Sequence, residues 1–201
     1  MSAPTKRIAV VGAGGHGKVV IDAIRPSTSM KVACVVDDST DHHGKTILGH
    51  LVSGGRDFLL ANRSSIDGVI VAIGANRTRV DFARWLEAEG FVLLSVIHPA
   101  ACVAPSAVVG TGTLIMPGAI VNADARIGRN VIVNSGAIVE HDCIVGDGVH
   151  VAPGAVLCGA AAVGSGTLVG AGAVLLPGVA VGDWTILKAG TVTKSSSGIT
   201  K

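Results

Sequence analysis

One histidine stands between two carboxylates where Glu140, His141 and Asp142 follow one another. A neutral imidazole can accept a proton near neutral pH, because its ordinary pKa is about 6.5. A carboxylate bonded to the other ring nitrogen fixes the tautomer and stabilises the imidazolium. Since adjacent residues of a strand face opposite ways, only one of the two acids should contact the ring. The triplet suits a general base, although a lone histidine is more often an ordinary surface residue.

A second group of residues suits phosphate binding. Gly12, Gly14 and Gly17 form the pattern G-x-G-x-x-G, and Asp37 follows 20 residues after Gly17. Between a strand and a helix, such glycines let backbone amides at the helix start approach a phosphate. The carboxylate of Asp37 can accept a hydrogen bond from a ribose or a base. The alternative interpretation is a tight turn that binds nothing.

The elements around this turn predict a small Rossmann-like α/β domain over residues 1–96. The segment RIAVVGAGGHGKVVIDAIR is typical of a strand, a glycine-rich turn and a helix, and KVACVVDD and DGVIVAIG are typical of buried strands. A helix is predicted in NRTRVDFARWLEAEG, where Phe82 and Leu86 have helical spacing. Strands that alternate with helices favour a parallel sheet.

The length of this domain favours a single nucleotide unit. About 95 residues with about four strands are too few for a complete two-lobed dinucleotide fold. His16 inside the glycine loop would also crowd a pyrophosphate, unless it serves another part of the ligand.

The second half, residues 97–201, has a period of six. Every sixth residue from Ile97 to Leu187 is Val, Ile or Leu, and the residue four positions after each of them is Ala, Thr, Val or Cys. This period fits neither a helix nor a plain strand array, and it is the signature of a hexapeptide β-helix. We expect the aliphatic side chains to point into the core, with the small ones beside them near each bend.

Composition excludes several classes of function. A formal net charge of +2, without a basic run, argues against nucleic-acid binding. The chain has no apolar stretch of the roughly 20 residues that span a bilayer. Its start, MSAPTKRIAVVGAGG, lacks the apolar core of a signal peptide, so we expect a cytoplasmic protein. The four cysteines form no C-x-x-C pair, and we expect buried free thiols.

The segments VVGAGGHGKVV, VVDD and VAIGANRTR, followed by the hexapeptide repeat, resemble the sugar acetyltransferases of bacterial surface-glycan synthesis. These include the sialic-acid O-acetyltransferase type and the nucleotide-activated amino-sugar N-acetyltransferases. The resemblance implies a left-handed parallel β-helix with three hexads per coil, hence about five coils. It implies homotrimers with acyl-donor sites between neighbouring β-helices. It also implies a nucleotide-sugar on residues 1–96 and acetyl-CoA, as co-substrate, along residues 97–201.

Roles for single residues follow from the same resemblance. His141 would be the catalytic base and Asp142 the acid that raises its basicity. The residues expected to meet the nucleotide-sugar are Gly14, Gly15, His16, Asp37, Asp38, Gly74 and Asn76. Those expected to meet acetyl-CoA are Asn134, His150, Gly170, Ala171, Ala189 and Gly190. No metal is expected.

We therefore expect acetyl transfer from acetyl-CoA to the amino group of a nucleotide-linked amino sugar. The main alternative is sugar O-acetylation of the sialic-acid type. A dinucleotide-binding oxidoreductase or sensor would use the glycine fingerprint, with the β-helix as a trimerisation stalk, but it leaves His141 and His150 idle. A metalloenzyme like the γ-class carbonic anhydrases needs a histidine spacing that is not found here. A nucleotide-binding scaffold without catalysis is the fourth possibility.

Overall fold

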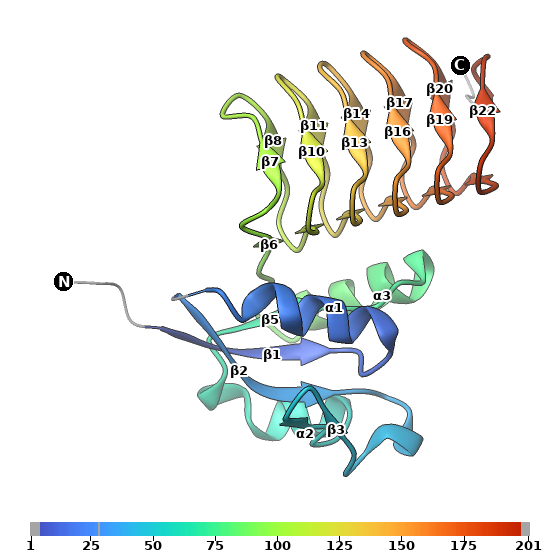
Figure 1. The fold of residues 1–201 in the computed structure, drawn as a ribbon. Helices are drawn as coiled ribbons and strands as arrows, with labels where there is room; N and C mark the ends of the chain where they lie inside the picture. The colour runs from blue at the N-terminus through green and yellow to red at the C-terminus, as the bar shows by residue number, and fades with distance from the viewer. Residues whose placement is uncertain (1–4, 28, 198–201) are drawn as a thin grey trace. The chain divides into compact units, whose positions relative to one another are not determined.

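A computed structural model describes residues 5–27 and 29–197 of the protein, while residues 1–4, 28 and 198–201 lie outside the description. The expectation of a cytoplasmic protein used the segment MSAPTKRIAVVGAGG, whose first four residues lie outside the description. Contacts divide the chain into two units, Met1–Val96 and Ile97–Lys201 (Figure 1). Each unit has its own sheets and its own hydrophobic core.

The first unit is built on a parallel sheet of three strands in the order β2-β1-β5. The strands are β1 (Lys6–Val11), β2 (Met30–Val36) and β5 (Gly68–Val71). Helix α1 (Gly15–Ile24) follows β1, and α3 (Asn76–Ala88) follows β5. The predicted alternation of parallel strands and helices is confirmed.

The segment between β2 and β5 was not anticipated from the sequence. It contains an antiparallel pair of two-residue strands, a short helix and two single 3₁₀ turns. In chain order these are η1 (Thr40–His42), β3 (Thr46–Ile47), β4 (His50–Leu51), α2 (Arg56–Ala61) and η2 (Arg63–Ser65). The sheet has three strands rather than about four, because Leu93 forms only an isolated bridge with Val69.

Alternate side chains of the sheet belong to two separate layers. Helices α2 and α3 cover one face, where Leu59, Phe82 and Leu86 pack in one cluster with side chains of all three strands. The residues between these on the strands, such as Val10 and Ile70, point to the other face and are also fully buried. Burial on both faces is typical of parallel sheets.

The second unit is a parallel β-helix whose strands have two residues each (Figure 1). The strands are β6 (Val96–Ile97), β7 (Cys102–Val103), β8 (Val108–Val109), β9 (Leu114–Ile115), β10 (Ile120–Val121), β11 (Arg126–Ile127), β12 (Ile132–Val133), β13 (Ile138–Val139), β14 (Ile144–Val145), β15 (His150–Val151), β16 (Val156–Leu157), β17 (Ala162–Val163), β18 (Leu168–Val169), β19 (Val174–Leu175), β20 (Ala180–Val181), β21 (Ile186–Leu187) and β22 (Val192–Thr193).

Every third strand stacks in register to form one of three sheets. We call them sheet I (β6, β9, β12, β15, β18, β21), sheet II (β7, β10, β13, β16, β19, β22) and sheet III (β8, β11, β14, β17, β20). Strand β10 pairs with β13, for example, so residues 18 apart lie one above the other. The predicted left-handed β-helix of hexapeptide repeats is confirmed.

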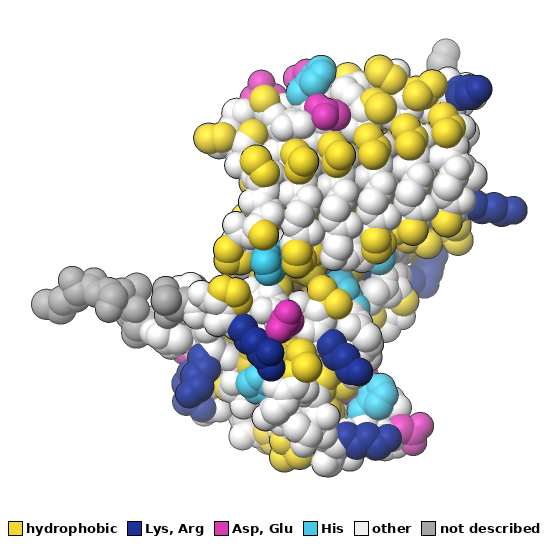
Figure 2. All heavy atoms as spheres, in the orientation of Figure 1, with side chains coloured by type: hydrophobic (Ala, Val, Ile, Leu, Met, Phe, Trp, Pro, Cys, Tyr) yellow, Lys and Arg dark blue, Asp and Glu magenta, His cyan; other side chains and the backbone are white. Residues whose placement is uncertain are grey.

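The aliphatic residues of the repeat form the core, as predicted. From Ile115 to Val181 every one of them is at most 3% exposed, and the apolar residues near the bends, such as Ala119 and Ala137, lie in the same cluster. Only the ends depart from the pattern, because a terminal coil lacks a neighbour on one side. Val103, Val109 and Leu187 are partly buried, and Ile97 is 49% exposed. Figure 2 shows further rows of hydrophobic side chains along the outside of the coils.

The chain turns at three corners in each coil, named here by the sheets that they join. In one coil, corner I–II contains Gly136, corner II–III contains Asp142 and corner III–I contains Gly148. All three residues have a positive φ, of 65°, 61° and 67° respectively. Glycine takes this conformation without strain, whereas Asp142 takes it at a steric cost.

The expectation of buried thiols is only partly correct. Cys34 and Cys143 are buried and Cys158 is half-buried, but Cys102 is exposed. Cys102 comes directly before the inward-pointing Val103, so its own side chain points outward. Among the described residues, no helix is long and apolar enough to cross a bilayer. The same residues contain no group of three or more His, Cys, Asp or Glu that could hold a metal ion.

Candidate active site

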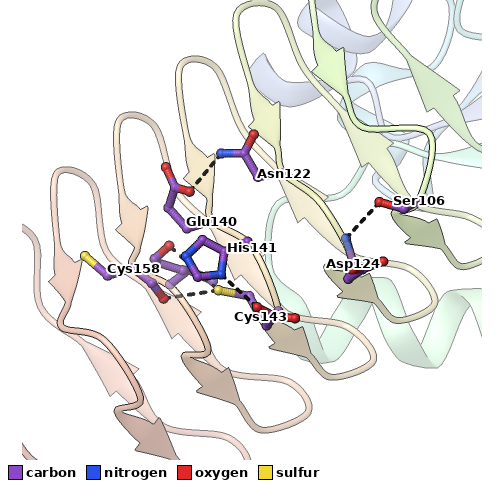
Figure 3. A network of polar contacts seen from close by, with 9 residues as sticks. Ser106, Asn122, Asp124, Glu140, His141, Cys143 and Cys158 are labelled. Carbon is purple, nitrogen blue, oxygen red and sulfur yellow. Dashed lines mark hydrogen bonds and ion pairs between the residues drawn. The ribbon is translucent and has the colours of Figure 1, made fainter.

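His141 lies at corner II–III, directly after strand β13 and Glu140 (Figure 3). Its Nδ1 lies 2.7 Å from Oδ2 of Asp142, while Glu140 accepts a hydrogen bond of 2.9 Å from Nδ2 of Asn122 on the preceding coil. Only one of the two acids therefore binds the ring, as expected, although the chain turns at Asp142, with a φ of 61°, rather than continuing as a strand. In the single chain the side chain of His141 is 62% exposed.

The hydrogen bond with Asp142 determines which nitrogen of His141 can act as a base. A carboxylate only accepts, so Nδ1 of the neutral ring carries the proton and Nε2 carries the free lone pair. This hydrogen bond is also the largest cause that raises the pKa of His141 above its ordinary 6.5. Some loss of hydration opposes it, and the charges of Asp142 and Glu140 add to it. The neutral ring is consequently a stronger base than a free imidazole.

Gly159 provides the space for this ring on the next coil. It stands 18 residues after His141, and a Cβ atom at this position would lie 2.7 Å from both Cε1 and Nε2 of the ring. Its φ lies outside the left-handed region, so the backbone does not require glycine here. Close approach of the ring is thus the reason that the structure offers for a residue without a side chain.

A second polar pair lies at corner I–II. Nδ2 of Asn134 is 3.0 Å from Nε2 of His150, the first residue of strand β15. Gly170 and Ala171 follow strand β18, and the remaining pair expected to meet acetyl-CoA follows β21, all at this same corner. That remaining pair is Ala189 and Gly190. One β-helix therefore gathers the residues expected to meet acetyl-CoA at one edge, and carries the histidine base at another.

In the first unit, some of the glycines are required by the fold, whereas others leave space beside the backbone. Gly12 has a φ of 109°, and a Cβ atom on Gly17 would collide with the carbonyl oxygen of Gly12, so glycine is required at both positions. At Gly14, Gly15 and Gly74, by contrast, nothing lies within 4 Å of an added Cβ atom. The open space above these three backbones lets a ligand approach the amides closely.

Two helices begin beside this open space. Gly14 is the N-cap residue of α1, and Ala75 is the N-cap residue of α3, with no side-chain hydrogen bond at either cap. The helices follow β1 and β5, which are neighbours in the sheet. The amides of a helix's first turn and the positive end of its dipole favour an anion at such a position. The carboxyl ends of neighbouring parallel strands are also where open α/β sheets bind ligands.

Asp37 holds the glycine loop in place. Its Oδ2 accepts a hydrogen bond of 2.7 Å from the amide of Ala13 and lies 3.1 Å from Nδ1 of His42, while Oδ1 accepts 2.8 Å from the amide of Ser39. Burial alone would raise the pKa of Asp37, but these hydrogen bonds lower it below its ordinary value. The carboxylate is therefore ionised and largely occupied by the protein itself.

Arg79 is a functional candidate that the sequence reasoning missed. Its side chain is fully buried in α3, and Nη1 donates to the carbonyl oxygens of Ile73 and Gly74, both at 3.0 Å. Nη2 donates to Oδ1 of Asn76 at 2.9 Å. Arg79 thus holds both the loop before α3 and the first residue of that helix, which include the expected substrate-binding residues Gly74 and Asn76. Burial, with a further contribution from the charge of Arg79, lowers the pKa of His16 to about 4, so His16 is neutral near pH 7.

Two family models match the chain, one in each unit. The model of the PglD N-terminal domain matches residues 7–86, and the model of bacterial transferase hexapeptide repeats matches residues 124–159. UDP-N-acetylbacillosamine N-acetyltransferase of Bacillus subtilis is 40% identical over 115 residues. That alignment covers 55% of this chain and 51% of the relative, so it spans about half the length of the curated protein.

Solved structures extend the similarity to nearly the whole chain. One is a variant of perosamine N-acetyltransferase from Caulobacter crescentus with one histidine replaced by asparagine, in complex with CoA and GDP-perosamine. It is 38% identical with a TM-score of 0.90, and the match covers 98% of this chain and 92% of that one. The chain belongs to the hexapeptide-repeat sugar acetyltransferases. The acetyltransferase domain of PglB from Neisseria gonorrhoeae, solved with acetyl coenzyme A, is another member, at 34% identity, a TM-score of 0.88, and coverage of 96% and 93%.

In this member of the family, the predicted site residues include three groups. His141 and Asp142 are bonded at one corner of the β-helix, and Asn134 and His150 lie together at another. The third group lies in the loops and helix starts of the first unit and comprises Gly14, Gly15, His16, Asp37, Asp38, Gly74 and Asn76. Gly159 could have been found from the sequence, because a residue 18 after a candidate base lies on the adjacent coil. For Arg79, the one indication in the sequence is a basic residue on the same helix face as the apolar residues Phe82 and Leu86.

Proposed function

We propose that this protein transfers the acetyl group of acetyl-CoA to the amino group of a nucleotide-linked amino sugar. The observation that carries the proposal is the bonded pair of His141 and Asp142, with Nε2 of the ring left to accept a proton. Relatives named as N-acetyltransferases of perosamine and of UDP-linked bacillosamine support an amine as acceptor. We place the protein among cytoplasmic enzymes of bacterial surface-glycan synthesis on the same basis.

The chemistry follows from the free lone pair on His141. As the amine nitrogen bonds to the carbonyl carbon of the thioester, Nε2 accepts the proton that the nitrogen loses. The carboxylate of Asp142 stabilises the imidazolium. When the C–S bond breaks, the imidazolium returns a proton to the leaving thiolate. Protons thus balance between amine and thiol, and the products are an amide and free CoA.

The first unit supplies a place for the nucleotide end of the acceptor. Phosphate oxygens would take the amides at the start of α1, above Gly14 and Gly15, where the backbone is open. The sheet has three parallel strands and so offers one nucleotide unit rather than the two halves of a dinucleotide fold. This supports a nucleotide-sugar in preference to NAD.

We also propose a homotrimer in which each active site combines two β-helices. Within one chain, His141 lies at corner II–III, and the Asn134–His150 pair lies at corner I–II. Parallel association about a threefold axis would bring corner II–III of one chain to corner I–II of its neighbour. Half-buried apolar side chains on the outer side of sheet II, such as Ile138 and Val156, would contribute contact area.

The activity is tested by following thiol release from acetyl-CoA with nucleotide-linked 4-amino sugars as acceptors. We expect turnover, and a loss of about 10²–10⁴-fold in kcat for His141→Ala with unchanged thermal unfolding. Product stable to hydroxylamine is an amide, whereas a labile product indicates O-acetylation. The proposal fails if His141→Ala retains full activity, or if calorimetry detects NAD binding while no acceptor is turned over.

The shared site is tested by mixing two inactive chains. One chain carries His141→Ala and the other carries Asn134→Ala with His150→Ala, and the two are co-expressed with different tags. Randomly mixed trimers should regain about a quarter of the wild-type activity, because one interface in four then combines both intact halves. Homotrimers of either variant should stay inactive. A mixture without recovered activity contradicts a site built from two chains.

A further inference from the structure

A cavity of about 190 Å³ lies at the carboxyl ends of the parallel strands of the first unit. It is separate from the open backbones above Gly14 and Gly15, and two carboxylates contribute to its wall. Its lining consists of Val11, Gly12, Asp37, Asp38, Ile73, Thr78 and Phe82. The apolar side chains suit the faces of a flat ring, and no lysine or arginine is part of this lining.

The two carboxylates of the cavity differ in how many of their oxygens accept hydrogen bonds from the protein. Asp37 is committed to the protein, since both of its oxygens accept hydrogen bonds from the amides of Ala13 and Ser39. Asp38 gives only one oxygen to a neighbour, because Oδ2 accepts a hydrogen bond of 2.9 Å from Nε of Arg56. No described residue donates a hydrogen bond to its Oδ1. Of the two carboxylates, Asp38 is therefore the one that can bind a ligand.

Arg56 fixes the orientation of Asp38. The guanidinium carbon of Arg56 lies 4.3 Å from the ring centre of Phe82 and 4.7 Å from that of Trp85. The arginine is thus held between an ion pair and two aromatic rings of α3. With 49% of its side chain exposed, Asp38 remains accessible to a group that enters the cavity.

A fixed carboxylate discriminates between nucleobases because it can only accept hydrogen bonds. Guanine presents two adjacent donors, N1–H and the N2 amino group, which match the open Oδ1 of Asp38 and the second lone pair of its Oδ2, beside the bond from Arg56. Uracil and thymine present one donor, N3–H, between two carbonyl oxygens that a carboxylate repels. Adenine and cytosine place an acceptor nitrogen beside their amino group. The donor pattern of guanine fits this wall, and the pattern of the pyrimidines of UDP and dTDP does not.

We propose that this cavity binds the base of the acceptor nucleotide and selects guanine, with Asp38 accepting hydrogen bonds from N1–H and the N2 amino group. The inference rests on the proposed function, since the guanine belongs to the nucleotide-linked sugar. It deepens that function by assigning a GDP-linked substrate class. Arg56 is a positioning residue, because it acts on the ligand only through Asp38.

Binding of free nucleotides tests the selection without any acetyl transfer. Isothermal titration of the full-length protein with GDP, UDP and dTDP should give a Kd for GDP at least about tenfold lower than for the other two. In Asp38→Asn, whose amide presents a donor as well as an acceptor, the preference should fall to about threefold or less. Asp41→Asn removes an exposed acid that lines no part of this cavity, and it should leave the preference unchanged.

The outcomes separate this inference from the proposed function. Equal or tighter binding of UDP or dTDP by the wild type overturns guanine selection, and so does an undiminished preference in Asp38→Asn. If UDP-linked 4-amino sugars are acetylated faster than GDP-linked ones, the acetyltransferase function holds and guanine selection fails. If GDP is preferred and Asp38→Asn abolishes the preference, but no amino sugar is acetylated, guanine selection holds and the proposed function fails.

Discussion

The two units of the chain carry their functional residues against very different backgrounds. In the β-helix, Ala123, His141, Gly159 and Pro177 occupy the same position on successive coils. A histidine among such residues is visible as a departure from the repeat, and its neighbour on the next coil follows from the period. In the α/β unit, the adjacent residues Asp37 and Asp38 look alike in the sequence, and only the structure distinguishes them, by their hydrogen bonds and their exposure. A candidate functional residue is therefore easier to recognise in a repetitive sequence than in one without a repeat.

Among the variants that test this comparison, we expect the largest loss of activity for Asp142→Asn. Asparagine tolerates the positive φ of this position, so the change removes charge and little else. We expect kcat/KM to fall by about tenfold to a hundredfold, less than for loss of the base itself. Because the carboxylate raises the pKa of His141, its removal lowers that pKa. The acidic limb of the pH profile of kcat/KM should therefore move to lower pH.

Glu140→Gln provides the matched control for that profile. Glu140 is hydrogen-bonded to Asn122 rather than to the ring, and its charge is the last and smallest of the causes that raise the pKa of His141. The limb should shift in the same direction by a smaller amount. A profile that responds to Glu140→Gln and not to Asp142→Asn would show that the wrong acid has been assigned.

Gly159→Ala should produce the next largest effect. The new Cβ atom would lie 2.7 Å from the ring of His141, so the ring must rotate or shift. A misplaced base typically costs about tenfold or more in kcat. The φ of Gly159 lies outside the left-handed region, so thermal unfolding should hardly change. The same change made in His141→Ala should have little effect on residual activity, and an equal loss in both backgrounds would contradict a role through the ring.

Much of the β-helix could be predicted because its core repeats. Inward Val, Ile and Leu residues at every sixth position fix the strands, and only ends such as Ile97 depart from the expected burial. That only one acid would contact His141 was expected from the sequence, whereas the choice of Asp142 over Glu140 came from the family resemblance. Three hexads per coil also predict three corners per coil. That His141 and Asn134 lie at different corners is visible only in the structure.

The α/β unit was less predictable, for reasons visible in particular residues. The fingerprint located the turn at Gly12–Gly17, but residues 40–65 form short elements that lack a strong period. Asp37 matched the expected acidic position, and its oxygens are nevertheless used by Ala13 and Ser39. Such contacts depend on backbone positions in loops, which no spacing rule describes.

Arg79→Lys tests whether a buried side chain of this irregular unit acts on the substrate. Lysine cannot donate to Ile73, Gly74 and Asn76 in the geometry of a guanidinium, so the loop should loosen. We expect KM for the nucleotide-sugar to rise about fivefold, kcat to stay within about twofold, and unfolding to cost about 1–3 kcal/mol less. Arg84→Lys, on the exposed face of the same helix, should change none of these. A fall in kcat at constant KM would instead place Arg79 in the chemistry.

The smallest expected effect, from Asp142→Gly, returns to the β-helix and concerns stability. The repeat places a residue of positive φ at this corner in successive coils, with Asp142 at 61° and Ala160 at 58°. Glycine removes the steric cost of that conformation, and an exposed His–Asp pair contributes little to folding. We expect the free energy of unfolding to rise by about 0.5 kcal/mol, measured by denaturant titration at one chain concentration, while kcat/KM falls at least as far as in Asp142→Asn. Ala160→Gly should give a similar gain in the free energy of unfolding and keep its activity. Both residues have a strained backbone, but only Asp142 binds the base. Equal activity in both variants would remove the reason for an aspartate at that corner.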